Sequence, residues 1–513
     1  MVKSLKAGIS PGCDGITTEH LLHGMCPALA TTLSNLYSAV LSTATVPSVI
    51  SAGVIIPVLK KPSCDPNLPS NYRPITLSSV HSKMIELVIM PSPDINDAQF
   101  GFREGRGTTF VTSLINDCAA YYKNRKSPMY LCSLDAEKCF DSIWHHGLMF
   151  KLWPILPLHH WLFLYRWYRS TNTVIHWNNC RSFSFSVSRG MRQGSILSPT
   201  LFNIFLDELL QQLQLIPHGI KVFDMSLNVC AYADDITLFA ATIPGLQCLI
   251  DKCVSYSEKY RFKFGLKKSK CMVLGKNPFA TSPRWKIGDS DIMCEDSVEI
   301  LGVTIENDLC YSRHVQKRIT SCRQRMYGLT SVGMSYPGLA SETKSYLWNS
   351  IGAPMITYGM ESVNLTNANL KQLRSVQGSI IKSVMGIPKR SHHSGLLEAL
   401  RIPTTDELVR VNASKLYHRI FSCESPASEI QQRFLTNYLT NNEVIPGTLI
   451  QRLLSQGASP VNSILNAPRK YTCRTKCHDN GIVDSLQSML FHDNYIKPHS
   501  NEHMLTVLLL RAF

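Results

Sequence analysis

Hydrophobic residues near the middle of the chain follow two patterns that indicate strands. Residues Met129–Leu134 form one apolar run that ends in Asp135, which predicts a buried strand with a carboxylate at its end. Residues Leu227–Ala240 are apolar at both ends and polar at Asp234 and Asp235, which predicts a hairpin whose turn carries two aspartates. Two separate apolar strands are therefore expected to end in acidic residues.

Helical and irregular patterns surround these strands. Ser198-Pro199 is expected to open a helix, with Ser198 as its N-cap and Pro199 in its first turn. The predicted buried stripe of that helix comprises Leu201, Phe202, Phe205, Leu209 and Leu213. Residues 61–74 contain four prolines, which predict an extended loop. From about Asn307 onward the segments are helical and basic, so we expect mixed α/β structure, a boundary near residue 305, and then mostly helices.

The segment between Glu19 and Lys60 carries no fully charged residue, yet it does not predict a membrane span. Prolines at positions 47 and 57 interrupt it, so no clean apolar run of about 18 residues exists. We expect a helix followed by a buried strand here, and no membrane partner. The N-terminal residues also lack the apolar region of a signal peptide.

The amino-acid composition says more about the binding partners of the protein than about its fold. The 513 residues include 52 Lys+Arg and 37 Asp+Glu, so the net charge is 52 − 37 = +15, and the sequence pI is near 9.1. Such a charge favours a polyanion, either nucleic acid or an anionic membrane surface. The 17 cysteines, an odd number without a C-x-x-C pair, indicate reduced thiols. Cys473, Cys477 and His478 are a candidate zinc group, although their spacing differs from that of the common sites.

The acidic strand ends predict metal chemistry on a nucleic acid. A single Asp at such a position is more often a turn former or a helix cap, but Asp135 and the pair Asp234-Asp235 lie on two independent strands. Charges at the ends of buried strands need partners, and hard oxygen ligands of this kind suit Mg²⁺. Two such ions about 4 Å apart can clamp an in-line phosphoryl displacement. With a basic chain, these acids predict nucleotidyl transfer.

Short motifs around these acids resemble those of reverse transcriptases. Residues 135–141 (DAEKCFD) look like the first catalytic motif, residues 189–199 (RGMRQGSILSP) resemble the Q-G-x-x-x-S-P segment, and residues 232–235 (YADD) are similar to the Y-x-D-D turn. Five further blocks narrow the resemblance to LINE-type, non-LTR retrotransposons. In chain order they are GCDGI (12–16), NYRPI (71–75), QFGFR (99–103), GLKKSK (265–270) and ILGV (300–303). All eight follow the family's order over residues 8 to about 305.

The resemblance implies a right-hand polymerase of the α/β (α+β) class. Residues 1–38 would extend the fingers, and residues 39–305 would form the fingers and a palm with an antiparallel sheet. Residues 306–400 would form a helical thumb. Residues 401–513 would be a tail to which the resemblance assigns no chemistry.

The resemblance also implies roles for individual residues. Asp135, Asp234 and Asp235 would hold two Mg²⁺ ions, for which Mn²⁺ could substitute, and Lys270 would protonate the departing pyrophosphate. Phe140 would block a ribose 2′-OH and so select deoxynucleotides. The other expected nucleotide-binding residues are Gln193, Gly194, Arg73 and Lys60. The expected nucleic-acid-binding residues of the thumb are Arg313, Lys317, Arg318, Arg323 and Arg325.

The implied reaction is the addition of dNTPs to a DNA primer on an RNA template, inside the cell, in the nucleus after a cytoplasmic ribonucleoprotein stage. The sequence departs from the family at three places. In the fingers, only 12 residues separate Glu86 from Gln99, which is shorter than usual for the family. Lys267 stands where the family usually has Asn, and Cys139 replaces a common Ala. Two alternatives stay open. A viral RNA polymerase would share the acids but lack the aromatic residue at position 140. A retroelement relic would bind RNA without polymerising.

Overall fold

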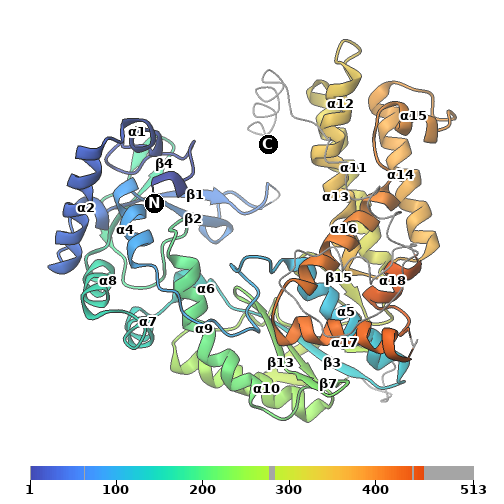
Figure 1. The fold of residues 1–513 in the computed structure, drawn as a ribbon, viewed down its shortest axis with the longest axis horizontal. Coiled ribbons are helices and arrows are strands. Elements are labelled where there is room, and N and C mark those ends of the chain that lie inside the picture. The colour runs from blue at the N-terminus through green and yellow to red at the C-terminus, as the bar shows by residue number, and fades with distance from the viewer. Residues whose placement is uncertain (1, 63, 276–282, 442–443, 456–513) are drawn as a thin grey trace.

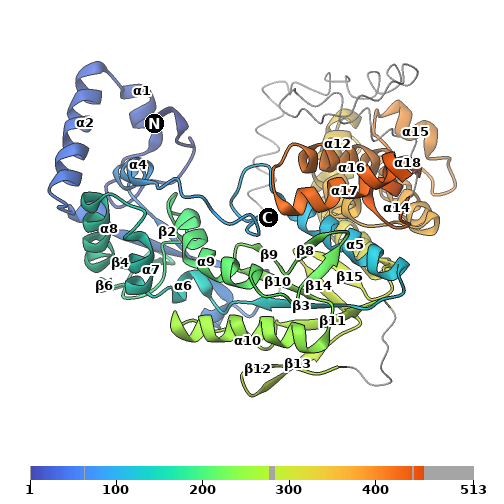
Figure 2. The same cartoon turned by 60° about the horizontal axis from the view of Figure 1, so that its bottom comes forward.

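The computed structural model describes residues 2–62, 64–275, 283–441 and 444–455. Figure 1 shows a chain bent into a U, with an N-terminal arm of sheet and helices on one side and a helical arm on the other. The base of the U holds a six-stranded sheet, and Figure 2 shows helices on both of its faces. The arms and the base have the arrangement of the fingers, thumb and palm of a right hand.

The fingers are built around a sheet with the strand order β2-β1-β4-β5. Its strands are β1 (Gly53–Leu59), β2 (Tyr72–Leu77), β4 (Asn172–Trp177) and β5 (Cys180–Arg181), with β6 (Phe185–Ser186) also paired to β4. The helices of this arm are α1 (Thr18–Gly24), α2 (Pro27–Ser42), α3 (Ser48–Ser51), α4 (Val80–Ile89), α7 (His145–Leu152) and α8 (Leu158–Ser170). The prediction of a helix followed by a strand between Glu19 and Lys60 is confirmed. No described helix is long and apolar enough to cross a membrane.

The predicted extended loop over residues 61–74 is wrong at its C-terminal end. A short 3-10 helix, η2 (Pro69–Asn71), precedes β2, which already begins at Tyr72. Pro74 lies within β2, opposite Pro57 of β1. Proline is tolerated there because β2 is the edge strand of its sheet, where a missing N–H donor leaves no partner unsatisfied.

The palm sheet has the strand order β12-β13-β11-β3-β10-β9. These strands are β3 (Met129–Asp135), β9 (Val229–Tyr232), β10 (Asp235–Ala240), β11 (Lys270–Leu274), β12 (Trp285–Ile287) and β13 (Ser290–Cys294). All neighbours run antiparallel except β11 and β13. The predicted strand that ends in Asp135 and the predicted hairpin of Leu227–Ala240 are both confirmed.

Helices cover both faces of the palm sheet. α9 (Ser198–Gln214) and α10 (Ile243–Lys259) pack on one face, and the predicted apolar stripe of α9 is buried there. The predicted N-cap is wrong, because Leu197 is the cap residue and the Ser198 hydroxyl donates to the carbonyl of Arg192 at 2.9 Å. α5 (Thr108–Asn124) packs on the opposite face, beside the two hairpins β7 (Ile220–Val222)–β8 (Met225–Leu227) and β14 (Ser297–Ile300)–β15 (Val303–Glu306).

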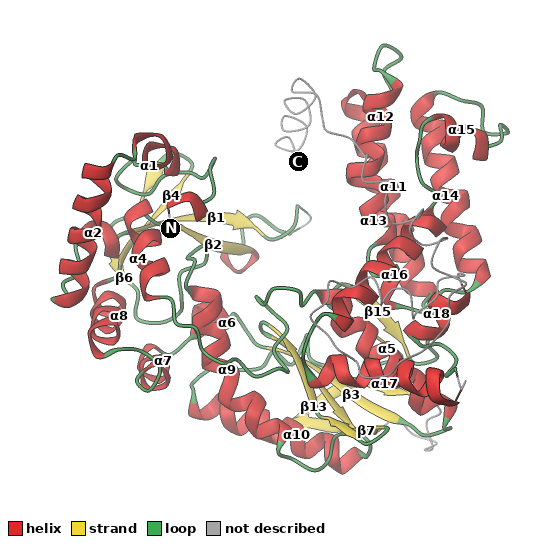
Figure 3. Cartoon of the chain, in the orientation of Figure 1, coloured by secondary structure: helices red, strands yellow, loops and turns green. Residues whose placement is uncertain are grey.

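The second arm consists of helices with a hydrophobic core of their own, as Figure 3 shows by colour. Its main helices are α11 (Ser312–Leu329), α12 (Ser341–Leu347), α13 (Ala353–Thr357), α14 (Asn367–Met385) and α15 (Ser394–Ala399). Short helical segments link them: η3 (Thr330–Met334), η4 (Trp348–Gly352) and η5 (Met360–Ser362). The predicted change from mixed structure to helices near residue 305 is confirmed.

The described part of the predicted tail packs onto the palm. Its helices are α16 (Thr405–Phe421), α17 (Pro426–Asn441) and α18 (Leu449–Ser455), and they share one core with α5. Asp117 of α5 is buried among them. It accepts hydrogen bonds from the amide of Leu449 at 2.8 Å and from Gln431 Nε2 at 2.9 Å, and it pairs with buried Arg452 at 3.5 Å. Because a buried charge needs such partners, this cluster fixes the tail helices on α5.

Candidate active site

Two strand ends bring three aspartates together on the palm. Asp135 ends β3, Asp235 begins β10, and the two residues are directly paired in the antiparallel register. Directly paired residues point to the same face of a sheet, and the pair Leu131–Phe239 shows that this face is the one covered by α5. Asp234 lies in the turn between β9 and β10. The structure thus unites the acids that the sequence places on separate strands.

Electrostatic interactions among these carboxylates raise the pKa values of Asp234 and Asp235. Burial, followed by the charges of Asp234 and Asp135, raises the pKa of Asp235 to about 6, and Lys268 opposes this shift. Burial also raises the pKa of Asp234, with a contribution from Asp135. Like charges held in this way favour a bound proton or a bound cation. Because the donors are hard oxygens, the site fits a divalent metal ion of the Mg²⁺ type.

A lysine that the sequence analysis did not single out already contacts one of these acids. Lys268 Nζ lies 3.1 and 2.9 Å from the two carboxylate oxygens of Asp135. Lys270, the predicted proton donor, pairs with Ser133 on the same face, but its Nζ lies 3.1 Å from Glu295. Of these two lysines, Lys268 is therefore the one in contact with the aspartates. The two positions belong to one motif, and motif spacing alone does not show which side chain turns toward Asp135.

Gln99 supports the turn between β9 and β10 that carries Asp234, here called the aspartate turn. The sequence motifs gave Gln99 no role. Its side chain is fully buried, and Oε1 accepts hydrogen bonds from the amides of Gly101 at 2.8 Å and Ala233 at 2.9 Å. Ala233 has a φ of +56°, in the left-handed region, directly before Asp234. A Cβ at Gly101 would lie 2.2 Å from the Ala233 nitrogen, so only glycine fits there. The QFGFR block marks these residues in the sequence, but only the folded structure shows that they contact the aspartate turn.

Phe140 lies in α6 (Cys139–Ser142), shortly after Asp135. Its half-buried ring stacks on Phe202 of α9, with centroids 4.6 Å apart and planes 15° apart, and Phe102 meets it edge-on at 6.1 Å. Two aromatic neighbours therefore hold the ring in one place. A ring held in one position is what exclusion of a 2′-OH would require, and this role stays a prediction.

The loop that carries Gln193 and Gly194 is tied to β2. The Thr76 amide donates to the Gln193 carbonyl at 2.7 Å, and Gln193 Nε2 donates to Asp141 at 2.7 Å. Gly194 has a φ of +108°, and a Cβ there would lie 3.0 Å from the Thr76 carbonyl oxygen. Glycine is therefore required by the backbone conformation and by the close approach of β2.

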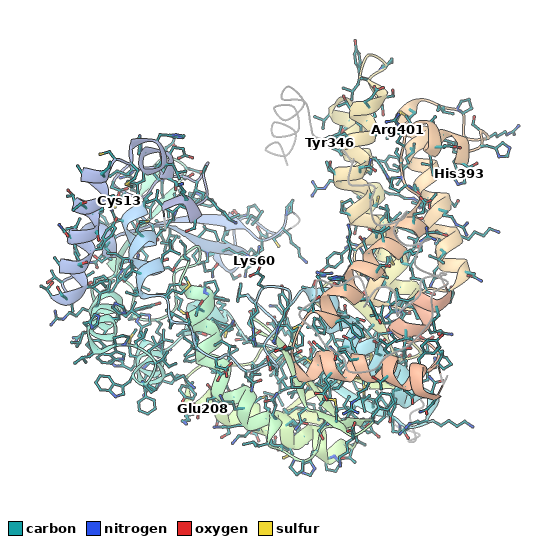
Figure 4. All side chains as sticks on the ribbon, viewed as in Figure 1. Cys13, Lys60, Glu208, Tyr346, His393 and Arg401 are labelled. Carbon is teal, nitrogen blue, oxygen red and sulfur yellow. The ribbon has the colours of Figure 1, made fainter. Side chains whose placement is uncertain are left out.

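Two predicted phosphate-binding cations lie on the β1–β2 hairpin of the fingers. Arg73 is exposed on β2. Lys60 follows β1, and Figure 4 shows it on the part of the hairpin that projects toward the helical arm. Lys60 Nζ donates to the carbonyl of Ser70 at 2.8 Å. Both side chains are thus on the fingers, on a different element from the aspartates.

The five basic residues predicted to bind nucleic acid all lie on α11. Contacts within the protein already engage the first three in chain order: Arg313 pairs with Glu306 at 3.6 Å, Lys317 pairs with Glu299, and Arg318 donates to the Met355 carbonyl at 2.8 Å. Arg323 and Arg325 are exposed. Nucleic-acid binding by the first three would require these contacts to be exchanged.

A second acidic group occurs where β15 leads into α11. Ligand atoms of Glu306, Asp308 and Cys310 lie within 4.8 Å of one another, and within the described residues the three active-site aspartates are not gathered this tightly. The Glu306 carboxylate is already engaged by Arg313, through the backbone amide at 3.0 Å and the guanidinium. The candidate zinc residues near position 475 lie outside the described residues.

A six-stranded palm with paired acidic strand ends, set between a sheet-containing arm and a helical arm, defines the architecture of a nucleic-acid polymerase. Residues 58–305 match the family described as reverse transcriptase (RNA-dependent DNA polymerase). The chain therefore contains a reverse transcriptase domain, and the relatives that it resembles belong to mobile and retrotransposable elements.

Two of these relatives come from Drosophila. The RNA-directed DNA polymerase from mobile element jockey of Drosophila funebris is 24% identical over 438 residues, which cover 82% of this chain and 47% of the relative. The Pol polyprotein of the type-2 element R2DM of Drosophila melanogaster is 29% identical over 212 residues, which cover 40% and 20%. The chain spans about half the length of the jockey relative.

Among solved structures, a telomerase of Candida tropicalis in complex with a fragment of telomeric RNA is 12% identical. The match covers 80% of this chain and 68% of the telomerase, with a TM-score of 0.38. At this score the likeness adds nothing to the fold described above.

Proposed function

We propose that this protein is an RNA-directed DNA polymerase that adds dNTPs to the 3′-hydroxyl of a primer. The observation that carries the proposal is the direct pairing of Asp135 with Asp235, with Asp234 in the adjoining turn. The reverse transcriptase match over residues 58–305 includes all three acids. The relatives bear the same activity in their names, which supports RNA as the template here.

Asp135, Asp234 and Asp235 would hold the divalent ions, for which Mg²⁺ is the natural choice and Mn²⁺ a substitute. Bound at this site, such ions would neutralise the triphosphate and make the attacking hydroxyl easier to deprotonate. The protein itself positions the acids, because Gln99 fixes the turn that carries Asp234. Lys268, an exposed ammonium beside Asp135, is better placed than Lys270 to donate a proton to the departing pyrophosphate.

The remaining residues select and orient the incoming nucleotide. Arg73 and Lys60 would bind its phosphates from the fingers, since a guanidinium offers a planar fork to phosphate oxygens. Gln193 and Gly194 would lie beneath its base. Phe140, held by two aromatic neighbours, would exclude the ribose 2′-OH and so favour dNTPs over rNTPs.

The test is template-directed primer extension. Purified protein receives poly(rA)–oligo(dT), Mg²⁺ and labelled dTTP, beside the double variant Asp234→Asn/Asp235→Asn. A matched control, Asp289→Asn/Asp291→Asn, removes two exposed charges from the β12–β13 hairpin, outside the site.

The proposal predicts extension by the wild type and by the control, and none by the active-site variant. Binding of the hybrid without extension, under any salt or metal condition, would leave only a relic that binds RNA. Extension with UTP as readily as with dTTP would instead indicate an RNA polymerase.

A further inference from the structure

A hollow of about 700 Å³ lies between the palm and the C-terminal end of α16. Residues 103–106, which begin at the last residue of the QFGFR block, line one side, and residues 418, 419 and 422–424 line the other. The two sides are separated by more than 300 positions in the sequence. The hollow therefore exists only because the tail helix packs against the palm, and no motif in the sequence indicates it.

Three arginines and a histidine are among the residues that line this hollow. Arg103, Arg106, His418 and Arg419 all contribute to it, and the first two share the carboxylate of Asp97 at 3.4 and 2.6 Å. Two carboxylates, Glu104 and Glu424, also line it, and both residues are exposed.

Arg419 differs from the other two arginines. It is exposed, and among the described residues it forms no salt bridge within 4 Å and donates one hydrogen bond, to the Thr109 hydroxyl at 3.4 Å. Its charge is close enough to Glu361 to oppose the rise in pKa that burial causes in that carboxyl group. Its Nη1 lies 3.2 Å from the position a Cβ would take at Gly107, the residue that opens α5. The guanidinium thus lines the hollow with most of its N–H donors free of hydrogen bonds to described residues, which suits recognition of a phosphate.

One side of the hollow begins close to the aspartate turn. Gly101 touches that turn at Ala233, and Phe102 touches Phe140. Arg103 is two residues beyond Gly101, which limits its backbone to about 7 Å from that contact. The backbone on the palm side of the hollow therefore lies near the active-site aspartates.

We infer that this hollow binds a backbone phosphate of the template–primer hybrid, with Arg419 as its main ligand and His418 beside it. Arg103 and Arg106 line the same hollow and are already paired with Asp97. The inference rests on the proposed polymerase function, and it gives the tail helix α16 a part in holding the substrate. Arg103 is the last residue of the QFGFR block, but neither the sequence motifs nor the family match, which ends at residue 305, includes His418 or Arg419.

The first test is the salt dependence of hybrid binding, measured by fluorescence anisotropy without catalysis. For a protein that neutralises phosphates, each contact contributes about 0.7–0.9 to the slope of log K against log[salt]. Arg419→Ala should therefore lower the slope by about this amount, and Arg419→Lys, which keeps the charge, should lower it much less. The control is Arg410→Ala on the same helix, because a position nine residues earlier is two and a half turns away and faces the opposite side.

The second test locates the phosphate. Single phosphates in either strand are replaced in turn by neutral methylphosphonates, and each hybrid is bound to the wild type and to Arg419→Ala. One linkage near the primer end should weaken binding to the wild type and have no effect on the variant. An unchanged salt slope in Arg419→Ala, or the lack of any such linkage, would overturn the inference.

The tests of the phosphate site and of the proposed polymerase function can fail independently of each other. A protein that shows the Arg419-dependent slope but never extends a primer would refute the polymerase proposal and leave the phosphate site. A protein that extends primers normally, with a slope independent of Arg419, would refute the site alone.

Discussion

Replacement of Gln99 by methionine is the sharpest perturbation of the site that leaves every acid in place. The two side chains have similar length and volume, so Gln99→Met keeps the packing and removes the amide. Oε1 then no longer accepts from Gly101 at 2.8 Å and Ala233 at 2.9 Å. The weaker contact from Nε2 to the Ala233 carbonyl, at 3.4 Å, is lost as well.

The magnitude follows from these contacts. A buried N–H that loses its acceptor costs about 1–3 kcal/mol, so two such amides cost roughly 2–6 kcal/mol if nothing moves. The turn can recover part of this energy only by shifting toward other acceptors, and Ala233 is bonded directly to Asp234. Because a displacement of about 1 Å at reacting groups can cost roughly 100-fold in rate, we expect kcat to fall by about 10- to 100-fold.

A matched control separates this effect from general destabilisation. Gln377 is also fully buried, donating to the Pro403 carbonyl at 2.8 Å and accepting from the Thr405 amide at 2.9 Å, far from the palm between α14 and α16. Gln377→Met should lower the thermal unfolding midpoint by a similar amount and leave single-nucleotide incorporation unchanged. If Gln99→Met keeps the wild-type rate, or if both variants lose rate equally, the reasoning about the turn is refuted.

Three further predictions concern side chains at the site. Lys268→Met should slow single-turnover incorporation by at least about tenfold, as expected for loss of a general acid, whereas equal loss in Lys270→Met would contradict the choice between them. Phe140→Ala should reduce the preference for dTTP over UTP, measured as a ratio of kcat/KM values, by at least about tenfold, and unchanged discrimination would remove its role. Because the pKa of Asp235 is raised from 3.8 to about 6, its ionisation lowers the folding stability as the pH rises from about 4 to 6. In EDTA at pH 7, the free energy of unfolding of Asp235→Asn should therefore exceed that of the wild type by roughly 3 kcal/mol. That gain should shrink as the pH falls from 6 to 4 in urea titrations, and a constant gain would show that the shift is absent.

Local sequence patterns predicted most of the strands and helices of the palm. The strand Met129–Asp135 and the hairpin around Asp234 were predictable because their apolar runs are long and their polar positions are few. The buried stripe of α9 was predictable for the same reason, since five large apolar residues at helical spacing have no other suitable environment. In all of these segments burial determines the structure, and buried positions are visible in the sequence as a pattern of apolar residues.

Contacts between residues far apart in the chain could not be predicted from such local patterns. Pro74 appeared to exclude a strand, yet the edge position of β2 accommodates it, and an edge is a property of the whole sheet. Gln99 supports a turn more than 130 positions away, so its role depends on tertiary packing. The choice of Lys268 over Lys270 depends on how one loop bends beside Asp135. Arg419 reaches the palm only because α16 folds back onto α5.

The central claim is that Asp135, Asp234 and Asp235 together perform templated nucleotidyl transfer. It is tested most directly by the single-turnover incorporation of one dNTP on an RNA template, with Asp135→Asn, Asp234→Asn and Asp235→Asn each compared with the wild type. The hybrid's affinity is measured in the same preparations. The account predicts that Asp135→Asn and Asp234→Asn lose at least about 1,000-fold in rate, because removal of a catalytic group that acts in a unit has effects of this order, while hybrid affinity stays near that of the wild type. Incorporation that survives in these variants, or a wild-type protein that binds the hybrid and incorporates nothing, would contradict it.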